Sequence, residues 1–227
     1  MLVKPSETKI GKWMRRHFKT GIVLLFLWLI YHFVLLPGML RWGATEAEYR
    51  GTLPGDDLLQ YQDYKNTLAV TIAATPSQIW PWVVQMGLHK GGFYSYTWLE
   101  NTFGCKLVNA DRIHPEWQHP AVGDIEPVCA SQEGKPNAGW QIAVLQENRA
   151  MVWKGLGGAQ WMMGIYIDSV DAHTCRLLTR QQFQFPKAGS ADWLLEKLWF
   201  TWAHCIMQHG MITGIKKRVE QRLNTYN

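Results

Sequence analysis

The sequence predicts an α+β fold in which a curved antiparallel sheet wraps around one long C-terminal helix, preceded by one transmembrane helix. Three features carry this prediction: an almost wholly apolar segment over 20–40, short alternating segments through the middle of the chain, and a helical apolar stripe near the C-terminus. Alternation with period two is typical of half-buried strands, whereas a helical period indicates an amphipathic helix. A sheet and a helix that each have one apolar face bury these faces against one another.

Residues 20–40 are expected to span a membrane. Their sequence, TGIVLLFLWLIYHFVLLPGML, contains no charged residue other than one histidine, and about 20 apolar residues cover a hydrocarbon core of about 30 Å. A cleaved signal peptide is the alternative, but its apolar region usually has about 7–15 residues and ends at small residues. Here the bulky pair Arg41 and Trp42 follows. A buried helix of a soluble core would need apolar partners on every side.

Positive charge is concentrated before this segment. The 227-residue chain has a formal net charge of +5, of which residues 1–41 carry +6 and the remainder −1. The basic balance therefore gives no reason to expect nucleic-acid binding by the rest of the chain. Six Lys or Arg precede the apolar segment, whereas only Arg41 and Arg50 follow closely. This bias predicts that residues 1–19 are cytoplasmic and that the C-terminal domain lies outside the cytoplasm.

A polar connector, residues 41–66, is expected to lead from the membrane to a folded domain over residues 67–223. The domain opens with a predicted strand in NTLAVTIAA, where Leu68, Val70 and Ile72 alternate with smaller or polar residues. This alternation is typical of a strand with one buried face.

Two short helices follow in the prediction. In TPSQIWPWVVQMG, Thr75 is a suitable N-cap, Pro76 suits the first helical position and Gly87 is placed to close the helix. Pro81 inside this pattern predicts a kink or a break. The second helix is expected over residues 96–103.

The remainder of the chain is predicted to be strands and one helix. Short polar links favour antiparallel hairpins between the strands, which are expected over residues 124–128, 140–146, 150–155, 161–170 and 174–185. A final helix of roughly thirty residues, beginning at residue 191, has one apolar stripe. The stripe consists of Leu195, Leu198, Trp202, Ile206, Met207, Met211, Ile215 and Val219.

The cysteines and histidines do not indicate a metal or a cofactor. Cys105, Cys129, Cys175 and Cys205 are separated by 24, 46 and 30 residues, which matches no zinc-binding spacing. An exported domain could form disulfides in any of three pairings, although Cys205 lies in a helical apolar pattern where a free buried thiol is expected. Histidine pairs five residues apart do not share a helix face. No dinucleotide fingerprint or nucleophile elbow occurs in the sequence.

Several motifs together carry a family resemblance. They are the first strand with TPSQIWPWVVQMG, then GGFYSYTWLEN, NADRIHPEWQ and GMITGIKKRVE. These motifs resemble the SRPBCC superfamily of START-like helix-grip proteins, especially its bacterial subgroup labelled polyketide cyclase/dehydrase, over roughly residues 42–223. The resemblance implies a helix-grip fold with an apolar tunnel between sheet and terminal helix. The superfamily uses this tunnel to bind lipids, sterols, polyketides or hormones, and only sometimes for catalysis.

The stretch GGFYSYTWLENTFG combines aromatic side chains with few polar ones, which suits a cavity for an apolar guest. Each aromatic residue alone is more often part of a packed core than of a cavity lining, and only the group together favours a cavity. Arg180 would point inward or to solvent depending on strand register, and an inward Arg180 would be expected to pair with Glu100 or a ligand. The predicted ligand-binding residues are Phe93, Tyr94, Tyr96, Trp98, Glu100, Asn101, Asp111, Arg112, Trp153, Trp161, Arg180 and Trp202, with Met163, Tyr166 and Met207 as further candidates.

Two functions of different classes fit these features. The first is a membrane-tethered module that binds a hydrophobic small molecule or lipid. The second is an enzyme of cyclase or dehydratase kind that uses Tyr96, Glu100 or the Asp111–Glu116 group as acid and base. The structural alternative for Asp111 and Arg112 is an ion pair or turn contact that holds a loop. A third possibility for the whole domain is a structural or partner-binding role with a vestigial cavity.

Overall fold

The computed structural model describes residues 9–102, 104–130, 134, 139–157, 160–197 and 201–226. The chain divides into two compact units, Met1–Met39 and Leu40–Asn227. The second unit includes the whole of the predicted connector together with the predicted domain.

The first unit is helical. It contains α1 (Lys9–Ile30), a π-helical turn η1 (Tyr31–Leu35) and most of α2 (Leu36–Leu40). Trp13–Leu40 spans 28 residues and contains an 18-residue stretch with a mean hydropathy of 2.2, none of which is buried. By length and composition this helix can cross a membrane, and its described side chains lack the burial that the core of a soluble protein would provide.

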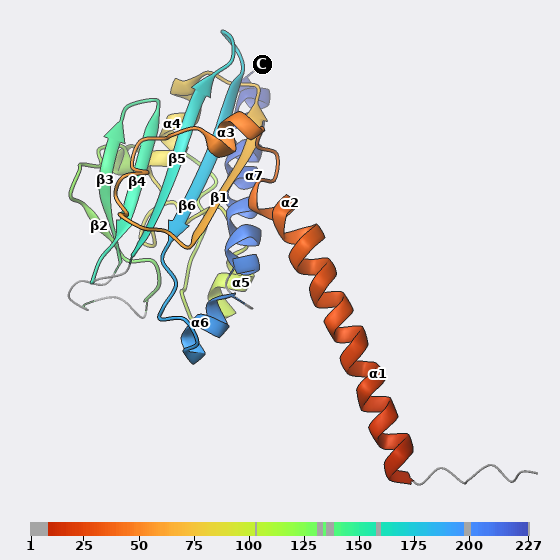
Figure 1. Ribbon diagram of the computed structural model, residues 1–227. Helices are drawn as coiled ribbons and strands as arrows, with labels where there is room; N and C mark the ends of the chain where they lie inside the picture. The colour runs from red at the N-terminus through yellow and green to blue at the C-terminus, as the bar shows by residue number, and fades with distance from the viewer. Residues whose placement is uncertain are drawn as a thin grey trace, which may run out of the picture. The chain divides into compact units, whose positions relative to one another are not determined.

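The second unit contains a six-stranded sheet in which every pair of neighbours is antiparallel (Figure 1). Its strands are β1 (Tyr64–Ile72), β2 (Ile125–Glu126), β3 (Trp140–Gln146), β4 (Ala150–Gly155), β5 (Trp161–Ser169) and β6 (Cys175–Phe183), arranged in the order β1-β6-β5-β4-β3-β2. The first strand therefore pairs with the last. The predicted fold class is confirmed: a curved antiparallel sheet with a long C-terminal helix and an apolar N-terminal helix.

The helices of this unit include the three predicted starts, at residues 76, 96 and 191, to within one residue, together with helical turns in the connector and at residues 115–117 that the sequence did not predict. They are α3 (Glu46–Arg50), α4 (Pro76–Val84), α5 (Thr97–Thr102), the 3-10 turn η2 (Pro115–Trp117), α6 (Ala191–Leu195) and α7 (Thr201–Tyr226). Thr75 forms a capping box with Gln78 at the start of α4, and Pro81 lies inside this helix without dividing it. The helix ends earlier than expected, with Gln85 as its C-cap. The single predicted C-terminal helix is represented by α6 and α7, and residues 198–200 lie outside the described part.

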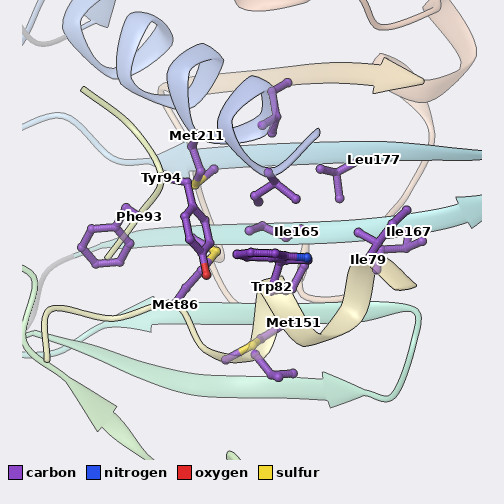
Figure 2. Packing of buried hydrophobic residues seen from close by; sticks show 14 of the residues in the cluster. Ile79, Trp82, Met86, Phe93, Tyr94, Met151, Ile165, Ile167, Leu177 and Met211 are labelled. Carbon is purple, nitrogen blue, oxygen red and sulfur yellow. The ribbon is translucent and has the colours of Figure 1, made fainter. Parts of the chain in front are cut away.

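Helix α7 and helix α4 pack on one face of the sheet and enclose the main hydrophobic core. Figure 2 shows Trp82 of α4 and Met211 of α7 among the side chains of β5 and β6. The stripe of α7 is confirmed at Met211, Ile215 and Val219, which are buried. Nearer the start of α7, the buried positions are instead Thr201, Cys205 and Gln208, whereas Trp202 and Ile206 are half-buried.

The connector covers the opposite face of the sheet. A second apolar cluster forms there between side chains of β1, β4, β5 and β6 and partly buried residues of the connector, including Leu53, Leu58 and Leu59. Tyr166 of β5 donates a hydrogen bond to the carbonyl oxygen of Pro54 at 2.9 Å. Both faces of the central strands are thus buried, and the connector is an integral layer of the compact unit.

Candidate functional site

A cavity of about 280 Å³ lies between the first turns of α7, strands β3, β5 and β6, and the segment that contains α5. Most of its lining side chains are apolar, and a few carry polar groups. The lining consists of Phe93, Ser95, Glu100, Cys105, Leu107, Val128, Cys129, Trp140, Met163, Gln181, Ala203, His204, Met207, Gln208 and Met211. Its volume is close to the lower end of the range of about 300–1,000 Å³ that is typical of small-molecule sites.

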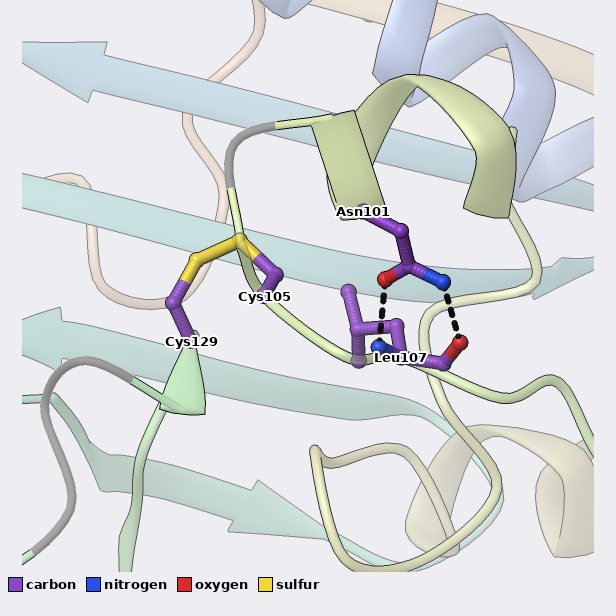
Figure 3. The surroundings of a disulfide bond; sticks show 4 residues. All are labelled: Asn101, Cys105, Leu107 and Cys129. Carbon is purple, nitrogen blue, oxygen red and sulfur yellow. Dashed lines mark hydrogen bonds between the residues drawn. A yellow bond between two sulfur atoms is a disulfide. The ribbon is translucent and has the colours of Figure 1, made fainter.

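A disulfide forms part of the cavity wall. Cys105 and Cys129 are bonded, and both cysteines line the cavity (Figure 3). The amide of Asn101 in α5 donates to the carbonyl oxygen of Leu107 at 2.9 Å and accepts from the Leu107 N–H at 2.6 Å. These bonds fix the end of α5 against the cysteine-containing segment. Cys175 and Cys205 are free and buried, which confirms the free buried thiol predicted for Cys205.

Segment 93–96 is held tightly against α7. The Ser95 hydroxyl donates to the carbonyl oxygen of Met207 at 2.9 Å. Tyr94 adopts a positive φ of 57°, a conformation that is costly for a residue with a bulky side chain. Its backbone N–H donates to the side-chain oxygen of Asn109 at 2.8 Å, and its hydroxyl accepts from the Gln85 amide at 2.9 Å. These bonds hold the turn that directs Phe93 toward the cavity.

Glu100 is the one carboxylate among the described lining residues. It is 3% exposed, and its Oε2 atom has no hydrogen-bond partner within the described part of the chain. Burial disfavours the charged carboxylate and raises the pKa of Glu100 to about 7. The side chain can therefore donate a proton or accept a hydrogen bond near neutral pH.

Two glutamines of the lining differ in their availability. Gln208 is fully engaged, because its Oε1 accepts from the Asn66 amide and its Nε2 donates to Thr179 Oγ1 at 3.2 Å. Gln181 contacts only the Met163 sulfur through its Nε2, at 3.8 Å, and its Oε1 has no partner among the described residues. Gln181 is thus the second side chain that presents an unused polar atom beside the cavity.

His204 contributes an uncharged imidazole to the wall. Burial lowers the pKa of His204 to about 4, so the ring is neutral over the physiological range. Its ring lies 5.5 Å from that of Phe183, measured between centroids.

The predicted aromatic residues occupy several different environments. Phe93 lines the cavity, as does Met163. Tyr94 is buried in the core, and the guanidinium of Arg218 lies 4.9 Å from the centre of its ring. Tyr96 is half-buried, with its hydroxyl 3.5 Å from the Nδ1 of His209. Trp98 is 71% exposed and points away from the interior, so its expected place in the lining is corrected.

The remaining predicted tryptophans lie outside the lining as well. Trp153 is buried in the main core, and Trp161 stacks on the cavity-lining Trp140 with 4.2 Å between ring centroids. Trp202 is half-buried on α7. Trp153 and Trp161 therefore support the wall from behind rather than forming its surface.

Arg180 lies on the other face of the sheet from the cavity. Its side chain is fully buried beneath the connector, where it forms an ion pair with Asp56. It also donates to Thr67 Oγ1 and to carbonyl oxygens of the connector, at 2.7 to 3.0 Å. Both orientations considered from the sequence, toward the cavity and toward solvent, are corrected: Arg180 ties the connector to the sheet, and Glu100 has no ion pair with it.

Asp111 and Arg112 are exposed and belong to a second, polar groove of about 490 Å³. This groove is formed with the last turns of α7 and includes Lys217, Arg218 and Arg222. It is separate from the apolar lining, so the structure does not bring the Asp111–Glu116 group together with Glu100. Among the described residues, no group of three or more His, Cys, Asp or Glu side chains is arranged to hold a metal ion.

Sequence reasoning missed the glutamines, His204 and Trp140. Gln181 alternates with Thr179 and Leu177 on the inner face of β6, a pattern that identifies the face once the register is known. Trp140 begins a predicted strand and could have been selected by the same criterion as Trp153. No sequence signal distinguishes the engaged Gln208 from the available Gln181.

Comparison with solved structures gives matches at low sequence identity. A protein of Mesorhizobium loti is 12% identical over 69% of this chain and 98% of its own, with a TM-score of 0.40. The KanY protein is 11% identical over 71% of this chain and 99% of its own, with a TM-score of 0.45. A Polyketide_cyc-like protein of Corynebacterium glutamicum is 17% identical over 69% of this chain and 87% of its own, with a TM-score of 0.34. No family model and no curated protein matches the chain.

Proposed function

We propose that this protein is a membrane-anchored binding module that takes up a hydrophobic small molecule or lipid in the cavity beside α7. The observation that carries the proposal is an apolar cavity of about 280 Å³ whose buried polar atoms are partly unused. A site of this composition binds an apolar body through its walls and orients it through a few polar groups. The motif resemblance to START-like helix-grip proteins supports the same reading.

The proposed anchor is the apolar segment 20–40, which lies within the helical stretch Trp13–Leu40. A tether of this kind would keep the domain close to a supply of apolar ligands in the bilayer. The Cys105–Cys129 disulfide supports a domain outside the cytoplasm, because disulfides persist in oxidising compartments. The basic residues before the anchor favour the same orientation.

Native mass spectrometry of the full-length protein, released from detergent micelles, tests the proposal. We expect a bound apolar molecule in a 1:1 complex with the wild-type chain. Ala203→Phe would fill the cavity, because Ala203 is part of its lining, and should release this molecule. Ala47→Phe is the matched control, since Ala47 is exposed on α3 and does not line the cavity. An identical mass spectrum for all three proteins, without a bound molecule, would contradict the proposal.

A second candidate function is an acid/base enzyme of cyclase or dehydratase kind that acts on the bound molecule. One observation favours it: the carboxyl of Glu100, in the cavity wall, has a pKa of about 7. Such a carboxyl is suited to proton transfer at neutral pH. If the bound molecule is converted, Glu100→Gln should abolish turnover while the ligand remains bound. Unchanged composition of the bound molecule over time in wild-type protein would exclude this candidate.

A further inference from the structure

The described cavity lining offers no positively charged side chain to pair with an acidic lipid. Among the described lining residues there is no Lys or Arg, and the imidazole of His204 is neutral because burial lowers its pKa to about 4. A ligand carboxylate or phosphate would thus enter an apolar space without a cation to pair with, and a buried unpaired charge is costly.

The two unused atoms in the wall are both oxygens. They are Oε2 of Glu100 and Oε1 of Gln181, and each lacks a hydrogen-bond partner among the described residues. The amide oxygen of Gln208 is already taken by Asn66, and the hydroxyl of Ser95 is already donated to Met207. A buried acceptor without a donor is unfavourable, so a ligand that supplies hydrogen-bond donors would relieve this cost.

We propose that the ligand of this cavity is an apolar molecule with a protonated amine as its head group, bound by the carboxylate of Glu100 and the amide oxygen of Gln181. The inference rests on the proposed binding function and adds the chemical class of the ligand. An ammonium group has three N–H donors and no acceptor, which matches a wall that offers unused acceptors.

The raised pKa of Glu100 fits this assignment. Without a partner, burial holds the proton on Glu100 and places the pKa of the carboxyl at about 7. An ammonium head group would supply the missing opposite charge, which favours the ionised carboxylate and lowers its pKa. Apart from His204 on α7, no titratable side chain faces Glu100 within the described lining.

The volume sets the size of a suitable probe. At about 30 Å³ for each water-sized group, the cavity holds on the order of ten non-hydrogen atoms. Three probes with the same ten-carbon chain, n-decylamine, n-decanol and n-decanoate, therefore differ only in the head group that meets Glu100 and Gln181.

The test is isothermal titration of the full-length protein in nanodiscs with these three probes at pH 8, with empty nanodiscs as the blank. We expect n-decylamine to bind at least about tenfold more tightly than n-decanol, since a charge-assisted hydrogen bond is stronger than a neutral one. n-Decanoate should bind most weakly. Lowering the pH from 8 to 5.5 should weaken only n-decylamine, because Glu100 becomes protonated.

Glu100→Gln should reduce n-decylamine affinity to that of n-decanol and change n-decanol affinity by less than about twofold. Equal or tighter binding of n-decanoate, or n-decylamine affinity that is independent of pH, overturns the amine assignment while the cavity remains a binding site. The pH series uses the wild-type protein, so it decides the question even if the variant misfolds. Failure of all three probes to bind overturns the proposed function and this inference together.

Discussion

Gly214 of α7 and Tyr94 approach each other so closely that no side chain fits between them. A Cβ atom added at position 214 would lie 2.1 Å from the backbone carbonyl oxygen of Tyr94. Segment 93–96, part of which lines the cavity, is therefore docked on α7 by contact between backbone atoms. Gly210, one turn earlier, faces the ring of Tyr96, which a Cβ would approach at 2.7 Å.

We predict that Gly214→Ala destabilises the domain by about 1–3 kcal/mol, the usual effect of overpacking. The clash outweighs the gain of up to about 1 kcal/mol that alanine brings to a helix interior. Gly210→Ala is the matched comparison, and its cost should be smaller because the ring of Tyr96 can move. Urea unfolding of both variants measures the difference. A Gly214→Ala protein as stable as the wild type would show that segment 93–96 is not held in this way.

Replacing Arg180 should loosen the connector. Arg180→Met removes the partner of Asp56 and leaves several carbonyl oxygens of the connector without a donor. Breaking one side of a buried ion pair typically costs about 3–5 kcal/mol. Arg180→Lys keeps the charge and should cost less. Limited proteolysis should cut the Arg180→Met protein within residues 41–63. If Arg180→Met resists cleavage as well as Arg180→Lys does, the role assigned to Arg180 is contradicted.

The stability of the domain should respond to pH through Glu100. The pKa of Glu100 rises from 4.5 in the unfolded chain to about 7 in the folded state. The folded protein holds this proton more tightly, so the contribution of Glu100 to stability is largest below pH 4.5 and is lost as the pH rises through 7. The limit of this loss is about 3 kcal/mol.

His204 has the opposite dependence, because its pKa is lowered from 6.5 to about 4 and its contribution is lost as the pH falls. The informative quantity is therefore the difference in unfolding free energy between Glu100→Gln and wild type. As the pH rises from 4.5 to 8, the unfolding free energy of Glu100→Gln should increase relative to that of the wild type. A difference that is constant with pH would mean that Glu100 is not buried without a partner.

Reduction of the disulfide should weaken both the fold and the cavity. Cys105 and Cys129 are 24 residues apart in sequence, and closing a loop of this length stabilises a protein by about 3–4 kcal/mol in the chain-entropy description. We expect the double variant Cys105→Ser with Cys129→Ser to lose about this much stability. Cys175→Ser provides a comparison at a free buried thiol. Melting temperatures measured with and without reductant check the result, and an insensitive wild-type protein would contradict it.

The fold was predictable because its local signals agree with its tertiary structure. The predicted segments 140–146 and 150–155 coincide with β3 and β4, since alternation and short polar links define a hairpin without further information. Thr75 and Pro76 likewise placed the start of α4. Each of these signals lies within a few residues of the structure that it determines.

The lining of the cavity was harder to predict because it depends on which way each side chain points. Trp98 and Glu100 are two residues apart in α5, so they lie on nearly opposite sides of the helix, one exposed and one buried. Arg180 and Gln181 are neighbours on β6 and face opposite sides of the sheet. Because the connector buries the outer face of the sheet as well, the pattern of polar and apolar residues along β6 does not reveal which face is the inner face.

The central claim is that the space beside α7 binds an apolar molecule, and saturation binding of n-decanol to the full-length protein in nanodiscs tests it most directly. We predict one saturable site in the wild type and in Ala47→Phe, and no saturable site in Ala203→Phe. Equal n-decanol binding by the wild type and Ala203→Phe would contradict the claim, because the alcohol would then bind outside the cavity.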